Sequence, residues 1–160
     1  MIRATAIAAL LLVGGCGYSF GSGLPAEGVR TVALKVVGNE TTRQRLEAEL
    51  SAALARELPI SSDLQLADRS RADAILEVIV TDARERTLVP GSGSTRVAEG
   101  ALAAAVRLRL VRRDGSVLLE RTLLDRTEFR DAIGEDLSTA RAELVADLAR
   151  KIALELQAGF

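Results

Sequence analysis

The chain contains no histidine and no tryptophan, and it has a single cysteine, Cys16. Without histidine it lacks the commonest general base and the commonest metal ligand of proteins. One cysteine cannot form an intramolecular disulfide or a zinc cluster. We therefore predict a protein that is not an enzyme, with no catalytic residues, no metal and no cofactor.

The chain also lacks an excess of charge of either sign. It has 21 Lys and Arg residues against 22 Asp and Glu residues, and its aromatic residues are one tyrosine and three phenylalanines. Proteins that bind nucleic acid need a basic surface or aromatic side chains on which bases stack. We therefore expect no nucleic-acid partner.

A short apolar run near the N-terminus is the strongest local pattern. Arg3 precedes the apolar residues Ala4 to Val13, and Gly14-Gly15 leads into Cys16. A positive residue, an apolar run and small residues before a cysteine are typical of a lipoprotein signal peptide. We expect residues 1–15 to be cleaved and Cys16 to carry acyl chains that anchor the protein in a membrane.

Two other interpretations of this segment are an uncleaved transmembrane helix and a secretory signal without lipidation. The apolar run is shorter than the roughly 20 residues that span a bilayer, and the only cysteine of the chain lies at the position that lipidation requires. Residue 17 is glycine and not the aspartate that retains lipoproteins in the inner membrane. We therefore expect the outer membrane, with the lipid anchor on its periplasmic side.

The rest of the chain has the length of one domain. Residues 16–28 are rich in glycine and predict a flexible lipidated tether, and residues 29–160 predict a single α/β sandwich domain. A first strand is predicted over 29–37, ended by Gly38-Asn39. A helix is predicted from Thr41 or Thr42 to Pro59 because leucines recur there at helical spacing.

Alternating apolar residues predict three further strands, over 74–89, 96–111 and 117–129, with a possible short strand over 64–66. A second helix is predicted over 136–157. The fold class is therefore α+β in β-α-β-β-β-α order, with two helices packed on one face of a four-stranded mixed sheet.

The other face of this sheet carries small and basic residues, namely Ala101, Ala103, Ala105, Arg107 and Arg109. Small side chains would let another protein or an acyl chain lie close to the strands. An ordinary solvent-exposed face of an antiparallel sheet has the same pattern. The sequence leaves both interpretations open.

Several segments resemble the lipopolysaccharide-assembly lipoprotein family LptE. They are Cys16-Gly17-Tyr18-Ser19-Phe20, Leu24-Pro25, Val29 to Leu34, Asn39-Glu40-Thr41 and Ala72 to Leu76. The resemblance extends over the chain after the signal peptide. It implies a protein that plugs the lumen of the outer-membrane β-barrel LptD, assists its assembly and contacts lipopolysaccharide.

Lipopolysaccharide carries phosphates, which arginine binds well. We predict contacts at Arg84 and Arg86, before one hairpin loop, and at Arg112 and Arg113, beside the Asp114-Gly115 turn. An alternative function is a peripheral outer-membrane lipoprotein that acts as a protein-binding regulator or secretion-system subunit. A hydrolase that uses serine and carboxylates is a third, weaker interpretation.

Overall fold

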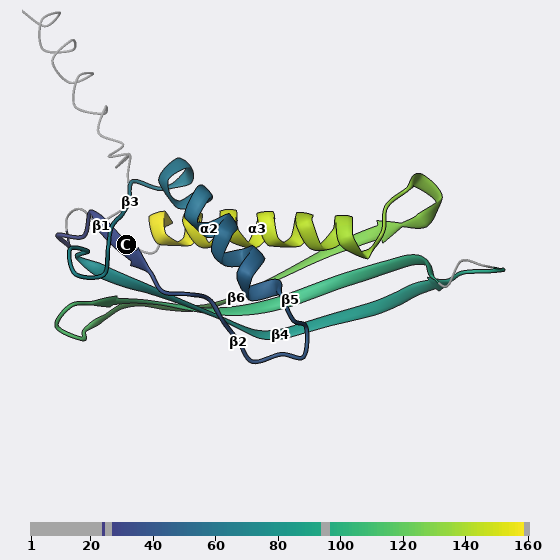
Figure 1. The fold of residues 1–160 in the computed structure, drawn as a ribbon, viewed down its shortest axis with the longest axis horizontal. Coiled ribbons are helices and arrows are strands. Elements are labelled where there is room, and N and C mark those ends of the chain that lie inside the picture. Colours follow the sequence, from purple (N-terminus) through teal and green to yellow (C-terminus); the bar gives the residue numbers. More distant parts are fainter. Residues whose placement is uncertain (1–23, 25–26, 94–96, 159–160) are drawn as a thin grey trace, which may run out of the picture.

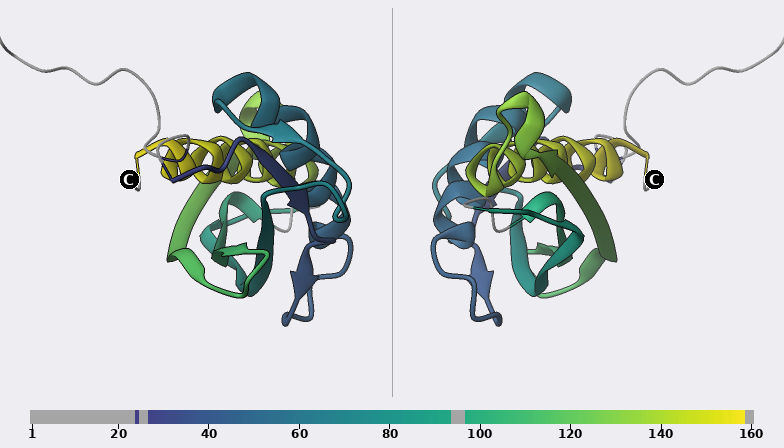
Figure 2. Two further views of the ribbon diagram at one scale, coloured as in Figure 1. Left: turned by 90° about the vertical axis from the view of Figure 1, so that its left-hand side faces the viewer. Right: turned by 90° about the vertical axis from the view of Figure 1, so that its right-hand side faces the viewer.

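The computed structural model describes residues 24, 27–93 and 97–158. Their elements in chain order are β1 (Thr31–Leu34), β2 (Gly38–Asn39), α2 (Leu46–Ser61), β3 (Gln65–Leu66), β4 (Ala74–Pro90), β5 (Val97–Arg112), β6 (Val117–Arg130), the 3-10 helix η2 (Asp131–Ile133) and α3 (Leu137–Ala158). Both α-helices lie on one side of the sheet, and the β4–β5 hairpin extends beyond them at the end opposite β1 (Figure 1, Figure 2).

The strands form one mixed sheet in the order β3-β1-β4-β5-β6, with β2 pairing with β4. β1 is parallel to β3 and β4, whereas β4, β5 and β6 are antiparallel to one another. The two helices and the mixed sheet confirm the predicted α+β class. The predicted number of four strands is wrong, because the two-residue strands β2 and β3 also join the sheet.

β2 corrects the predicted end of the first strand. Instead of only breaking that strand, Gly38 and Asn39 pair in parallel with Ile79 and Val80 of β4. A Cβ atom on Gly38 would lie 3.4 Å from Cγ1 of Ile79, so glycine allows the two strands to approach closely. A two-residue strand shows no alternation that a sequence pattern could reveal.

Helix α2 begins later and ends later than predicted. Asn39 and Thr41 form a local turn, in which the Asn39 Oδ1 atom accepts hydrogen bonds from the backbone and hydroxyl of Thr41 at 2.9 and 2.7 Å. Arg45, with φ of 76°, precedes the first helical residue, Leu46. Pro59 lies inside the last turn of α2 and does not end it.

Helix α3 begins one residue after its predicted start because Asp136 caps it. The Asp136 Oδ1 atom accepts hydrogen bonds from the backbone N–H groups of Ser138 and Thr139 at 2.8 and 2.9 Å. The hydroxyl of Thr139 donates to the backbone carbonyl of Asp136 at 2.7 Å. These bonds satisfy donors that would otherwise be free at the helix N-terminus. The backbone N–H of Thr139 is the main cause that lowers the pKa of Asp136.

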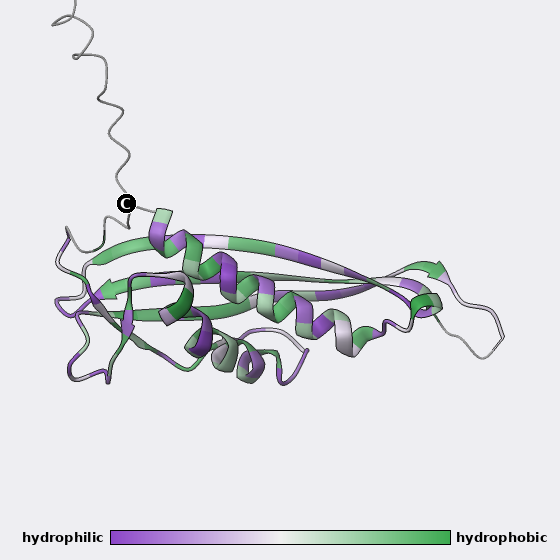
Figure 3. Ribbon diagram, turned by 90° about the horizontal axis from the view of Figure 1, so that it is seen from above, coloured by the Kyte–Doolittle hydropathy of each residue, from purple (hydrophilic) through white to green (hydrophobic). Residues whose placement is uncertain are grey.

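The core lies between the two helices and the inner face of the sheet. Alternate residues of β5 are buried there, as the sequence predicts, and α3 contributes an apolar stripe that Figure 3 shows against its polar face. The principal buried residues of β5 and α3 are Leu102, Ala104, Val106, Leu108, Leu110, Leu144, Leu148, Ile152 and Leu156. The part of the chain that the structure describes has no helix both long and apolar enough to span a membrane.

Leu24 belongs to the predicted flexible tether, but it packs in the core of the domain. Leu24 is fully buried, and its carbonyl accepts a hydrogen bond from the N–H of Val29 at 2.9 Å. Cys16 and the predicted signal peptide lie outside the described residues.

Asp73 joins the start of β4 to β1. The Oδ2 atom of Asp73 accepts hydrogen bonds from the Thr31 hydroxyl at 2.7 Å and from the N–H groups of Thr31 and Arg30 at 2.9 and 3.1 Å. The hydroxyl of Thr31, followed by the two N–H groups, lowers the pKa of Asp73. The carboxylate therefore stabilises the parallel β1–β4 pairing in its charged form.

Replacing Asp73 by asparagine should lower the free energy of unfolding at neutral pH by about 1–3 kcal/mol, since bonds to a charged acceptor are lost. Because the folded pKa is lowered, the stabilisation is present above the unfolded value of 3.8 and is lost as the pH falls through the folded pKa. Thermal unfolding across this range should therefore depend less on pH in Asp73→Asn. Glu143→Gln on the exposed face of α3 is the control, and equal effects of both substitutions would contradict the prediction.

Candidate functional site

A β-bulge in β4 positions the basic residues of the candidate site. The pairing of β4 with β5 shifts between Val80 and Asp82, so one extra residue, Thr81, lies in β4. A one-residue shift moves each following side chain to the opposite face of the sheet. As a result Asp82, Arg84 and Arg86 lie on the outer face, away from the helices.

On this outer face the bulged part of β4 lies beside a row of alanines in β5. Asp82 pairs with Ala105, Arg84 with Ala103 and Arg86 with Ala101. On the other side of the row, β6 places Leu124 opposite Ala105 and Arg126 opposite Ala103. The small side chains leave a hollow between the longer side chains of β4 and β6.

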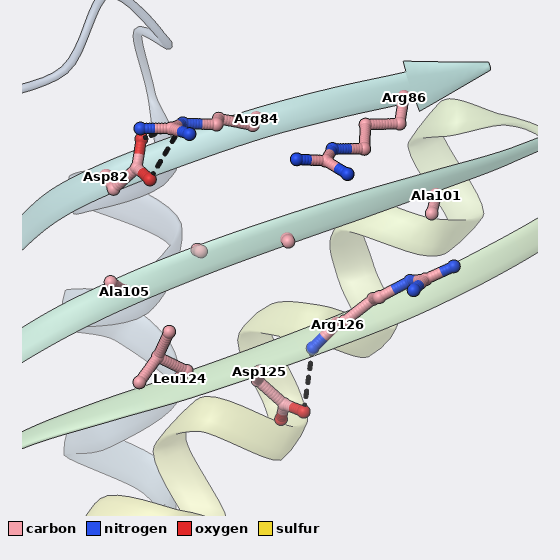
Figure 4. A pocket seen from close by; sticks show the side chains of 10 residues that line it. Asp82, Arg84, Arg86, Ala101, Ala105, Leu124, Asp125 and Arg126 are labelled. Carbon is pink, nitrogen blue, oxygen red and sulfur yellow. Dashed lines mark hydrogen bonds and ion pairs between the residues drawn. The ribbon is translucent and has the colours of Figure 1, made fainter.

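The hollow has a volume of about 210 Å³. Figure 4 shows Arg86 of β4 and Arg126 of β6 on either side of the alanine floor, with their side chains running in opposite directions along the strands. We call this hollow the alanine pocket; it is lined by Asp82, Arg84, Arg86, Ala101, Ala103, Ala104, Ala105, Leu124, Asp125 and Arg126.

Most charges around the alanine pocket are already neutralised by neighbours. Arg84 pairs with Asp82 at 2.9 Å and Arg126 with Glu128 at 2.6 Å. Asp125, on the edge strand, pairs with Lys151 of α3 at 2.7 Å.

Arg86 differs from these residues, since it has no hydrogen-bond or ion-pair partner within residues 24, 27–93 and 97–158. A free guanidinium beside a small apolar floor fits a ligand that has an anionic group and an apolar part.

A second hollow, of about 260 Å³, lies nearer to β1 on the same face. It is lined by charged side chains that pair across the strands: Glu77 lies 2.9 Å from Lys35 and 3.8 Å from Arg109, and Arg109 lies 3.4 Å from Glu120. The hydrogen bond from Lys35 is the main cause that lowers the pKa of Glu77. Because these charges satisfy one another, this hollow offers no free charge to a ligand.

The four predicted contact residues do not lie together. Arg84 and Arg86 line the alanine pocket, whereas Arg112 and Arg113 lie at the β5–β6 turn, beside the opposite end of β4. Arg112 donates to the backbone carbonyl of Glu27 at 2.6 Å and pairs with its carboxylate at 3.0 Å. Arg113 donates to the carbonyl of Ser70. Both arginines therefore have bonding partners within the domain.

The sequence did not predict that Arg126 lines the site, or that the alanine row forms the floor of a hollow. The row itself is visible in the sequence as alternate alanines on the outer face. The position of Arg126 opposite Ala103 depends on the β5–β6 register, which shifts by one residue between Leu110 and Val111. Counting outward from the Asp114-Gly115 turn without this shift would place Asp125 opposite Ala103, so no local sequence signal could have found Arg126.

A family model for lipopolysaccharide assembly, LptE, matches residues 29–156 of this chain. The chain belongs to the LptE family. The match covers most of the chain and includes every strand, helix α2, all but the last two residues of α3, and the alanine pocket. Membership of the LptE family supports a role as a lipopolysaccharide-assembly lipoprotein of the cell envelope, and no enzymatic activity.

Solved structures share this fold at low sequence identity. The hypothetical protein CT253 from Chlamydia trachomatis is 15% identical with a TM-score of 0.59, and the match covers 81% of this chain and 96% of that one. Uncharacterized lipoprotein B from Nitrosomonas europaea is 17% identical with a TM-score of 0.55, over 82% of this chain and 84% of that one.

The PelC dodecamer from Paraburkholderia phytofirmans is 20% identical with a TM-score of 0.52, over 76% of this chain and 87% of that one. At these identities the likeness concerns the fold alone. A comparison with curated proteins found no match.

Proposed function

We propose that this LptE-family chain is an outer-membrane lipoprotein that occupies the lumen of an LptD β-barrel, assists assembly of that barrel and contacts lipopolysaccharide. The observation that carries the proposal is the alanine pocket with the unpartnered guanidinium of Arg86. The family match supplies the biological context. Cys16 would hold the protein to the periplasmic leaflet through its acyl chains.

The length of the domain supports this placement. β4 has 17 residues, which at about 3.3 Å per residue extend over about 56 Å, more than the roughly 30 Å hydrocarbon core of a bilayer. β1 lies at the end of the molecule where β4 starts, and the β4–β5 hairpin lies at the other end (Figure 1). Leu24 lies beside β1, because its carbonyl accepts a hydrogen bond from Val29. A protein anchored at Cys16, eight residues before Leu24, could therefore extend its hairpin far along a barrel.

The outer face of the sheet also suits a polar barrel lumen. Cross-strand ion pairs cover the part nearer β1, for example Lys35 with Glu77 at 2.9 Å and Arg107 with Glu40 at 3.3 Å. Such pairs keep the face hydrophilic without a large net charge. The lumen partner would therefore meet a polar surface with one hollow of mixed apolar and basic character.

Within that hollow, a lipopolysaccharide phosphate would accept hydrogen bonds from Arg86, and the alanine floor with Leu124 would contact an apolar part of the same molecule. Arg84 and Arg126 line the same pocket and would have to leave Asp82 and Glu128 to reach the anion. The assignment of Arg112 and Arg113 as lipopolysaccharide contacts stays a prediction, at the other end of the sheet.

Replacing Arg86 by glutamate should weaken lipopolysaccharide binding about tenfold, because a charge-assisted contact becomes a repulsion. Binding is measured by titration of the purified lipoprotein with lipopolysaccharide. Arg56→Glu, an exposed residue on α2 at the far side of the sheet, makes the same change of net charge and should leave binding unaltered. Equal binding by both variants would remove Arg86 from the proposed contact.

The barrel proposal is tested by purifying the lipidated protein from outer membranes in mild detergent and identifying what remains bound. A large β-barrel recovered in a one-to-one ratio supports the plug. Recovery of the protein alone, or with soluble partners, contradicts the plug and favours a peripheral protein-binding regulator or secretion-system subunit.

A further inference from the structure

β6 is an open edge of the sheet. It has 14 residues and pairs on one side with β5, and none of the described strands pairs with its other side. Exposed edges of this length present unpaired backbone groups that bind other strands unless they are blocked. β6 contains no proline, and its register with β5 is regular from Leu119 to Arg130.

Two side-chain contacts identify the backbone groups at the open edge. Lys151 of α3 reaches the Leu124 carbonyl at 3.4 Å, and the Asp125 carboxylate accepts a hydrogen bond from the Arg126 N–H at 2.9 Å. Neither backbone group therefore bonds to β5. Since backbone groups alternate in direction along a strand, Glu120, Thr122, Leu124 and Arg126 all present their N–H and C=O groups outward.

An apolar groove runs beside this edge. It has a volume of about 360 Å³ and lies between β6 and α3, lined by Leu123, Leu124, Lys151, Leu154, Glu155 and Ala158. The side chains of Leu124 and Leu154 are 71% and 50% exposed. A strand added at the edge would cover both leucines.

We propose that the open edge of β6 pairs with β6 of a second copy of this chain, antiparallel and centred on Leu123. The two sheets would then join into one through the two β6 strands. This pairing concerns the protein outside its barrel and does not depend on the function proposed above.

Charge complementarity selects both the partner and the register. With Leu123 opposite Leu123 of the second copy, each Arg126 lies opposite a Glu120, and each Arg121 lies opposite an Asp125. The two-fold axis repeats both contacts, so four pairs of opposite charge form and no like charges face each other. Opposite charges directly across two strands stabilise the pairing, and like charges destabilise it.

Neighbouring registers lack this match. Centring the pair on Leu124 places Glu128 opposite Glu120 twice, and centring it on Asp125 places that carboxylate opposite itself. Exposed ion pairs add little affinity each, so they determine the register, while the backbone hydrogen bonds and the covered leucines hold the copies together.

Cysteine cross-linking of the full lipidated chain tests the register. At the axis the two Leu123 Cα atoms would lie about 4.5 Å apart, within the range that a disulfide needs. Leu123→Cys should give a disulfide-linked dimer under mild oxidation. Glu128→Cys is the control: it is more exposed, but its two copies would lie roughly 34 Å apart, so it should give no dimer. Equal cross-linking of both variants, or none at Leu123→Cys, would overturn the proposal.

A charge exchange tests the same pairing with Leu123 intact. Glu120→Arg places like charges opposite each other at two positions and should lower the association constant about tenfold in sedimentation experiments. Adding Arg126→Glu restores opposite charges and should restore association. A monomer at all concentrations, or an equal loss in the double variant, would show that no second copy occupies this edge.

Discussion

Replacing Leu148 by alanine should lower the free energy of unfolding by about 2–5 kcal/mol. Leu148 lies on the apolar stripe of α3 and is fully buried in the core between the helices and the sheet. The substitution removes its apolar contacts and leaves a cavity that the surrounding close-packed side chains fill only in part. Urea denaturation followed by circular dichroism measures the loss.

Ile60 of α2 provides the control for Leu148. Its side chain is 77% exposed, so Ile60→Ala removes little buried surface and should change the free energy of unfolding by about 0.5 kcal/mol or less. Similar losses for Leu148→Ala and Ile60→Ala would contradict the position of the core.

Removing the ring of Phe129 should destabilise the hairpin end of the sheet, at a cost of about 3–5 kcal/mol for Phe129→Ala. Phe129 is buried and pairs with Gly100 across β5 and β6. Its ring covers the backbone of Gly100 so closely that a Cβ atom there would collide with the ring. An aromatic ring lying on a glycine of the neighbouring strand in this way stabilises the pairing.

The same contact predicts that the effect of Gly100→Val on stability depends on whether Phe129 is present. Gly100→Val alone should destabilise by about 1–3 kcal/mol, because Phe129 must move. In the Phe129→Ala background the valine would occupy the space left by the ring, so the same change should be neutral or stabilising. Denaturation of the two single variants and the double variant measures the coupling. Additive losses would show that Gly100 and Phe129 do not pack on each other.

The long elements could be predicted closely from the sequence. The strands predicted over 96–111 and 117–129 occur as β5 (Val97–Arg112) and β6 (Val117–Arg130), and the helix predicted over 136–157 occurs as α3 (Leu137–Ala158). Each of these segments repeats its apolar period several times, and Asp136 or Asp114-Gly115 marks a boundary. Long periodic segments are therefore determined locally.

The short or irregular features could not be predicted in this way. β2 has two residues, and α2 begins at Leu46 because Asn39 and Thr41 bond to each other instead of capping the helix. The bulge at Thr81 has no sequence signature, yet it decides that Arg84 and Arg86 lie over the alanine row. β2 and the bulge depend on residues of a neighbouring strand, whereas the start of α2 depends on a local turn that competes with the helix cap.

The candidate site could be predicted only in part from the sequence, because it too depends on the pairing of neighbouring strands. The alanines of β5 and the arginines of β4 could be identified as surface residues of one sheet. Whether they lie beside Arg126 depends on the registers of two strand pairs, each of which contains a one-residue shift. The separation of Arg112 and Arg113 from this site follows from their place at the turn at the other end of β5.

The sequence by itself determined the α+β class, the long strands and helices, the resemblance to the LptE family and the absence of histidine chemistry. These properties depend on composition and local periodicity, which each segment carries alone. The tertiary structure decided the six-stranded sheet, the alanine pocket, the unpartnered Arg86 and the open edge of β6. These depend on strand order and register, which follow from the packing of residues far apart in the chain.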